Sequence, residues 1–91
     1  MDLLLFLPYQ IRFNDNGADS GYLESMIETY GNQISLPNQV YEKRGYFFAG
    51  WKVDPDSDDV IYADGEAILF EQEGLDLYAE WIPIIYQIEY I

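Results

Sequence analysis

Residues 44–51 read RGYFFAGW, and four of these eight residues are aromatic. Because side chains alternate between the two faces of a β-strand, this stretch places Phe47 and Trp51 on one face and Tyr46 and Phe48 on the other. A small domain needs its largest apolar side chains inside, which predicts that the face carrying Phe47 and Trp51 is core. The alternative is a ligand platform, in which exposed rings stack on sugars.

The same alternation marks two more strands. In YQIRF, residues 9–13, and in LDLYAEW, residues 75–81, every second residue from the first is apolar or aromatic. Gly45 and Gly50 predict a turn and a bulge or close backbone approach. Three alternating strands rich in Phe, Tyr and Trp predict a β-dominated domain.

Length and charge limit the partners. The chain has 91 residues, nine Tyr, five Phe, two Trp and a formal net charge of -13, from 4 Lys+Arg and 17 Asp+Glu. A chain of this length forms one small domain, and its aromatic side chains can supply a dense core. Since nucleic acid affinity comes mainly from cations that neutralise phosphates, neither nucleic acid nor an anionic membrane surface is an expected partner.

Catalysis is not expected either. The chain contains neither His nor Cys, which removes the usual general bases, catalytic triads and nucleophile pairs. Carboxylates could still act in pairs, but such a pair needs a substrate-shaped cleft, for which a small aromatic-cored sheet has little room. We therefore expect a non-enzymatic domain that needs no cofactor.

One segment favours a helix. Between Ser20 and Tyr30, apolar residues recur at spacings of one, three and four, with polar residues opposite them. Asp19 or Ser20 could cap the start, and Gly31 could close the end in a left-handed conformation. The local pattern therefore predicts a short helix beside the sheet, which is an α+β arrangement.

An acidic turn raises the question of a cation. In DPDSDD, Asp54, Asp56 and Asp58 stand at positions 1, 3 and 5 of a would-be calcium loop. Such a loop requires Gly at its sixth position and Glu at its twelfth, where this chain has Asp59 and Gly65. A solvated acidic turn is favoured, and the three aspartates remain a weak metal candidate.

The N-terminus does not indicate export or membrane insertion. The apolar run Leu3 to Leu7 is shorter than the core of a signal peptide, and Asp2 stands where a positive residue belongs. No run approaches the length of a membrane span. We expect no membrane insertion by this chain.

A short sequence echo connects the two ends. YQIRFN at residues 9–14 recurs as YQIEYI at residues 86–91, an offset of 86 - 9 = 77 residues. Self-similarity at a fixed period is typical of repeat arrays, although Tyr/Ile alternation also recurs in strands by chance. If the echo is a true repeat, the chain holds one repeat and the first strand of the next.

Taken in order, the motifs of the chain resemble the Listeria/Bacteroides repeat, the group that includes the B repeat of internalin B. The resemblance covers about residues 9–82 and rests on YQIRFNDNG, Tyr30-Gly31, Leu36-Pro37, RGYFFAGW, YADG at 62–65 and LYAEW at 77–81. Family members usually have a strand just before the Tyr-Gly pair, in contrast to the helix that the local pattern predicts. The insert at 18–23 and the acidic DPDSDD depart from the family pattern.

The resemblance implies a β-grasp-like small twisted sheet with at most one short helix. It also implies a tandem module of secreted or cell-surface bacterial proteins, often between an adhesive domain and a cell-wall anchor. No catalytic residues are known for the family, so none is carried over. On this interpretation residues 1–8 are an N-terminal extension, 9–82 the repeat module, and 83–91 a C-terminal strand that opens the next repeat.

Two binding functions are compatible with these features. The first is a stalk, spacer or adhesion module whose partners are neighbouring repeats and a host or cell-surface protein. The second is a carbohydrate-binding module that uses exposed aromatics, including Trp81. The candidate interaction residues are Tyr46, Phe48, Tyr78 and Tyr86. The apolar segment 84–91 is a further candidate for strand-mediated self-association, because an unpaired strand seeks a sheet edge.

Overall fold

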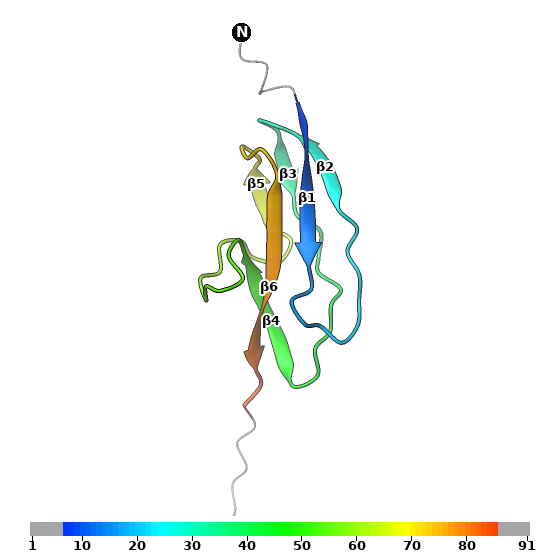
Figure 1. The fold of residues 1–91 in the computed structure, drawn as a ribbon, viewed down its shortest axis with the longest axis vertical. Coiled ribbons are helices and arrows are strands. Elements are labelled where there is room, and N and C mark those ends of the chain that lie inside the picture. Colours follow the sequence, from blue (N-terminus) through cyan, green and yellow to red (C-terminus); the bar gives the residue numbers. More distant parts are fainter. Residues whose placement is uncertain (1–6, 86–91) are drawn as a thin grey trace, which may run out of the picture.

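The structure, a computed structural model, describes residues 7–85 and consists of two β-sheets. Its strands are β1 (Pro8–Asn14), β2 (Met26–Thr29), β3 (Gln33–Ser35), β4 (Tyr46–Lys52), β5 (Ala67–Leu69) and β6 (Leu75–Pro83). The larger sheet has the order β2-β1-β6-β4 (Figure 1), and β3 and β5 form a separate antiparallel pair. The described chain is therefore β-dominated, as predicted.

The first and last strands, β1 and β6, pair in parallel and so run in the same direction. These two strands lie at the centre of the larger sheet, and β2 and β4 flank them as antiparallel edge strands. Both central strands run from the upper to the lower end in Figure 1, so the described chain enters at one end and leaves at the other.

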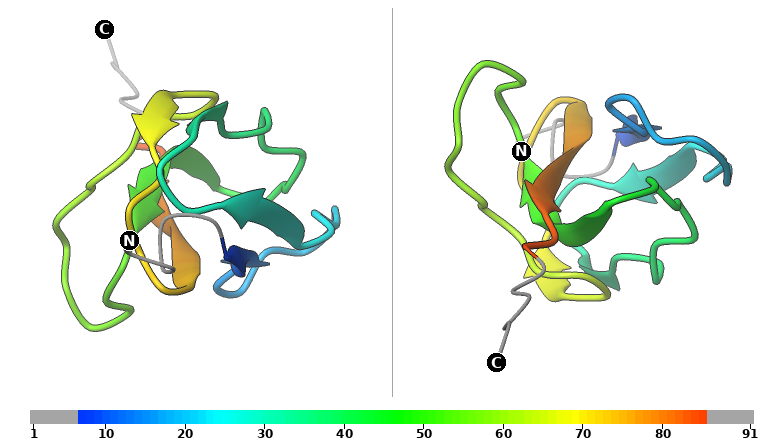
Figure 2. Two further views of the ribbon diagram at one scale, coloured as in Figure 1. Left: turned by 90° about the horizontal axis from the view of Figure 1, so that it is seen from above. Right: turned by 90° about the horizontal axis from the view of Figure 1, so that it is seen from below.

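The core is built from both sheets. Viewed along the long axis, the strands surround a common interior (Figure 2). The buried apolar residues form one cluster, made of Ile11, Ile34, Leu36, Tyr41, Trp51, Ile68, Phe70, Leu75, Leu77 and Ala79. The alternation predicted for residues 9–13 and 75–81 is confirmed, because the odd-numbered residues of both stretches face this cluster.

Trp51 lies at the centre of the aromatic part of the core. Its side chain is 0% exposed, and its ring lies 5.0 Å from Phe48, 5.2 Å from Phe13 and 5.9 Å from Tyr41, measured between centroids. Each of these pairs is tilted or edge-to-face, the arrangement that aromatic quadrupoles favour. The prediction that Trp51 is core is confirmed.

The prediction for Phe47 is wrong. Its side chain is 48% exposed, whereas Phe48 packs against the core. Phe48 pairs with Trp81 and Gly50 with Glu80, so Ala49 is an extra residue in β4. This bulge, of the kind predicted at Gly50, resets the alternation and turns Phe48 to the same side as Trp51.

The helix predicted between Ser20 and Tyr30 is also wrong. Residues 7–85 contain no helix, and so none that is long and apolar enough to cross a membrane. Ser20 bridges Glu42, and β2 pairs with β1 over Met26–Thr29. The helical face would have had to bury Ile27, which is 69% exposed. Residues 26–29 form a strand because their backbone groups pair with those at the edge of β1, and because Ile and Thr have high strand propensity.

Glycines shape the turns between the strands. Gly31 has φ of 93° in the turn between β2 and β3, closed by the Asn32 N–H donating to the Thr29 carbonyl at 3.1 Å. Gly45 has φ of 83° in the turn before β4, closed by the Tyr46 N–H donating to the Lys43 carbonyl at 3.0 Å. Gly31 is thus left-handed as predicted, but in a turn that connects the two sheets instead of at a helix end.

Candidate interaction site

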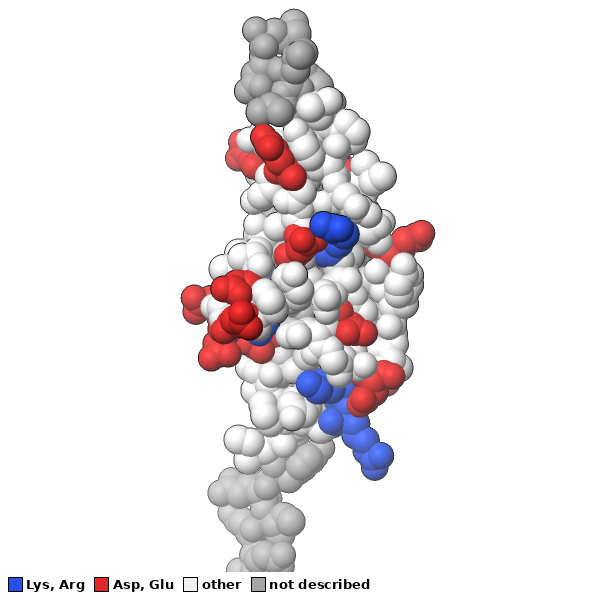
Figure 3. Space-filling view, in the orientation of Figure 1, with Lys and Arg blue, Asp and Glu red and all other residues white. Residues whose placement is uncertain are grey.

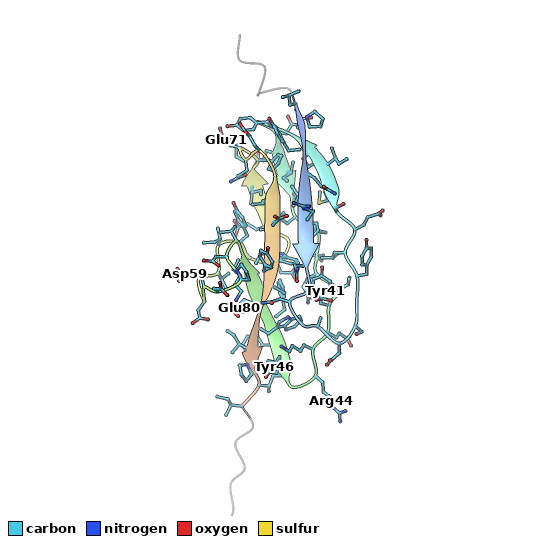
Figure 4. All side chains as sticks on the ribbon, viewed as in Figure 1. Tyr41, Arg44, Tyr46, Asp59, Glu71 and Glu80 are labelled. Carbon is cyan, nitrogen blue, oxygen red and sulfur yellow. The ribbon has the colours of Figure 1, made fainter. Side chains whose placement is uncertain are left out.

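An open hollow of about 550 Å³ lies at the lower end of the domain. Its wall includes the aromatic residues Phe48 and Trp81, the apolar Ile84, the cations Lys43 and Arg44, and Tyr46. Figure 4 labels Tyr46 at this end, beside the lower parts of β4 and β6, and Arg44 at the turn that precedes β4. We call this surface the end hollow.

The aromatic wall of the end hollow is held rigidly. The ring of Phe48 stands edge-to-face against Trp81 at 5.8 Å and 76°, and against Trp51 at 5.0 Å and 71°. Trp81 is half-buried, and its Nε1–H donates to the Asp15 carbonyl at 2.8 Å. Because the rings are steeply inclined to one another, Phe48 and Trp81 do not form a flat stacking surface.

The basic wall is formed by a tight turn. The Lys43 ammonium lies 4.3 Å from the centroid of the Tyr46 ring, within range of a cation–π interaction. The Arg44 backbone N–H donates to Asp19 Oδ2 at 2.7 Å, and this bond holds the turn in place. Figure 3 shows the resulting basic projection at the lower end.

Lys43 and Arg44 are the cations left without an acidic partner in the described part of the chain. Within residues 7–85 the ion pairs are Arg12–Asp76, with Nε to Oδ1 at 2.8 Å, and Lys52–Glu80, at 3.5 Å. On a domain with a net charge of -13, two adjacent unpaired cations form a local exception to a negative surface.

Burial changes the acid–base behaviour of one residue beside this surface. Tyr41 is buried, and loss of solvation raises the pKa of its phenol. The carboxylate of Asp15 raises that pKa further, as does Tyr22 to a smaller extent, while a hydrogen bond with the Leu23 backbone acts in the opposite direction.

The predicted interaction residues do not form one site. Tyr46 and Phe48 line the end hollow, whereas Tyr78 lines a smaller hollow of about 380 Å³ beside the Arg12–Asp76 pair. Tyr86, and with it most of the segment 84–91 predicted to self-associate, lies outside the described residues.

The acidic turn comes after β4 and has its own internal hydrogen bonds. Asp54 Oδ1 accepts the N–H of Asp56 at 2.9 Å, and Lys52 Nζ donates to the Ser57 carbonyl at 2.9 Å. Within residues 7–85, no three acidic side chains gather as a metal-holding group, Asp54, Asp56 and Asp58 included. Calcium binding here stays a weak prediction, which a calorimetric titration at millimolar calcium would test.

Comparison with known proteins identifies the family. A sequence profile of the Listeria-Bacteroides repeat domain matches residues 9–80, most of the chain. The chain belongs to the Listeria-Bacteroides repeat family. This repeat is also 31% identical, over 85 residues, to a protein of Evansella cellulosilytica provisionally named a Gly-rich membrane protein. The match covers 90% of this chain and 10% of that protein. No solved structure matches the repeat.

Sequence reasoning found part of the end hollow and missed the rest. The sequence predicts Tyr46, Phe48 and Trp81 as candidate exposed rings and includes Ile84 in the segment 84–91 expected to self-associate, but it does not single out Lys43 and Arg44. The available signal was the Lys43-Arg44 pair itself, which is half of the four Lys and Arg in the chain. The position of Ile84 beside this turn has no such signal, because it depends on the pairing of β4 with β6.

Proposed function

We propose that this Listeria-Bacteroides repeat is a non-catalytic spacer module of a bacterial cell-surface or secreted protein. Its role is to hold neighbouring domains apart and to take part in adhesion through protein contacts. The observation that carries the proposal is that the aromatic side chains of this stretch pack in the core or against each other. Trp51 and Phe48 are committed to the core, and Trp81 is locked against Phe48.

The placement of the chain ends supports the same role. The described chain enters β1 at one end of the domain and leaves β6 at the opposite end, so a module inserted in a longer protein keeps the domains on its two sides apart (Figure 1). The related protein of Evansella cellulosilytica is about ten times as long as the matched region, which fits a module repeated or embedded in a large protein.

The fold that accompanies this proposal is a β-grasp variant without its helix. Support comes from the parallel central strands β1 and β6, each with an antiparallel partner at its outer edge. The segment between β3 and β4, which contains no helix, adds Leu36 and Tyr41 to the core.

The distance between the chain ends tests the spacer role. Because the chain lacks Cys, the double variant Leu7→Cys, Ile85→Cys can carry two dyes at exposed positions without further engineering. We expect single-molecule energy transfer to report one narrow distance that is unchanged by glycans or by protein ligands. A broad distribution in the folded protein would contradict a spacer.

The carbohydrate-binding alternative rests on the open end hollow. Its Tyr46 ring is partly exposed and lies beside two cations that can donate hydrogen bonds. Against it, the rings of Phe48 and Trp81 are inclined at 76° and cannot both stack on one sugar face. A glycan array read out with wild type and Tyr46→Ala separates the two functions, because a spacer binds none of the glycans in either form.

A further inference from the structure

The sequence period and the strand boundaries leave almost no linker between two successive modules. The echo of residues 9–14 at 86–91 gives a period of 77 residues. β1 begins at Pro8, so the first strand of a following module would begin at 8 + 77 = 85, while β6 ends at Pro83. Only residue 84 lies between the two strands.

Backbone hydrogen bonds hold the described chain at both of its ends. The Ile84 N–H donates to the Gly45 carbonyl at 2.8 Å, in the turn that precedes β4. At the other end of the module the Leu7 carbonyl accepts the Tyr30 N–H at 3.1 Å. Since 7 + 77 = 84, Ile84 of one module occupies the position of Leu7 in the next.

We propose that successive modules dock end to end, with the lower end of one seated on the upper end of a second copy. This inference rests on the proposed function as a tandem spacer. Residue 84 belongs to both modules: its N–H binds the Gly45 carbonyl of the first, and its carbonyl binds the Tyr30 N–H of the second. A junction tied on both sides of one residue cannot act as a flexible linker.

The two ends that meet have opposite charges near the junction. On the lower end, Lys43 and Arg44 directly precede Gly45, which holds Ile84. On the upper end, the Gly31 N–H donates to the Phe70 carbonyl at 2.7 Å, which places the Glu71–Glu73 loop beside the Tyr30 turn. Figure 4 labels Glu71 at this end and Arg44 at the opposite one.

Charge complementarity of this kind favours one orientation of the contact. The basic turn carries two cations that are unpaired in residues 7–85, and the loop after β5 carries two exposed glutamates. Asp19 and Glu42 also line the end hollow, and Asp19 is already bound to the Arg44 N–H. Docking removes water from the partly exposed Leu7, Tyr46 and Ile84 as well.

A tandem protein tests the proposal. It consists of residues 1–85 followed by residues 9–91, so that the 77-residue period and the residue pair Ile84-Ile85 are kept. We expect its melting temperature to exceed that of the single chain by about 5 °C or more. We also expect X-ray scattering to report one extended shape. A version with four Gly and Ser residues inserted after Ile84 should melt like the single chain.

A position-matched pair of variants tests the charges. In one variant, Lys43→Glu and Arg44→Glu are made in the first module, where the new glutamates lie opposite the glutamates of the second module. In the other variant the same two changes are made in the second module, whose lower end contacts no further module. The two proteins have the same composition and net charge, so any local effect on folding is shared. We expect the first-module variant to melt at least about 3 °C lower than the second-module variant.

The possible outcomes distinguish end-to-end docking, the part that Lys43 and Arg44 play in it, and the spacer function on which it rests. A tandem that melts like the single chain, with or without the inserted residues, overturns end-to-end docking and leaves the module as an independent spacer. A stabilised tandem whose two charge variants melt together overturns the assignment of Lys43 and Arg44 to the contact. A broad end-to-end distance within the single chain would contradict the spacer function itself.

Discussion

At the scale of single residues, Trp51 decides how this small domain is stabilised. It is fully buried, and the rings of Phe13, Tyr41 and Phe48 surround it. Its Nε1–H has no acceptor among residues 7–85, a cost of about 1–3 kcal/mol that its packing must exceed. Trp51 therefore stabilises the fold through the packing of its large ring. Because that ring is fully buried, it cannot stack on a ligand.

Tyr41 makes stability sensitive to alkaline pH. Its pKa is raised by burial above the ordinary value of 10.0, so the folded state favours the neutral phenol. This contribution is fully present below pH 10 and is lost as the pH rises through the folded-state pKa. We expect urea unfolding to show wild type losing stability above pH 10 more steeply than Tyr41→Phe. Parallel pH profiles for the two proteins would contradict this role.

At the scale of elements, the bulge in β4 explains which aromatic faces inward. Gly50 has φ of 141°, and a Cβ atom there would lie 2.4 Å from Val60 Cγ1 and 2.8 Å from the Tyr62 carbonyl oxygen. The bridge between Trp51 and Tyr62 therefore requires glycine beside it. This close approach holds the segment around Val60 against β4 and fixes Trp51 in the core.

Two glycine substitutions separate crowding from backbone strain. Gly45→Ala meets nothing within 4 Å and should cost only the strain of φ at 83°, about 1–2 kcal/mol of unfolding free energy. Gly50→Ala adds steric overlap and should cost about 3 kcal/mol or more. Urea denaturation measures both. Equal losses would show that the segment around Val60 is not held against β4.

The strands that could be predicted are those whose alternation reflects burial on one face. Residues 9–13 and 75–81 behave in this way because both lie at the centre of the sheet. The local pattern could not identify residues 26–29, since a short edge strand buries little and its apolar residues also fit a helix. The family resemblance, by contrast, implies a strand just before Tyr30-Gly31, where β2 lies. In β4 the strand was evident from its aromatics, but the extra residue Ala49 shifted the faces, and alternation alone cannot show a bulge.

At the scale of the whole molecule, the proposed end-to-end docking depends on the surfaces that the two ends present. The sequence could indicate the family and the aromatic residues Tyr46 and Phe48. It could not show that Lys43 and Arg44 gather beside Ile84, because that arrangement depends on pairing between distant strands. The charges are also unevenly placed, with acidic residues over the loop after β4 and a basic turn at the lower end (Figure 3).

Acrylamide quenching of tryptophan fluorescence tests most directly whether Trp51, the last residue of the aromatic stretch 44–51, is a core residue and not part of a binding platform. A neutral quencher is needed because a net charge of -13 repels iodide. In Trp81→Phe only Trp51 emits, and we predict that it is almost completely shielded, while Trp81 in Trp51→Phe is quenched to an intermediate extent. If Trp51 were quenched as readily as free tryptophan, its side chain would be exposed to solvent and could not be a core residue.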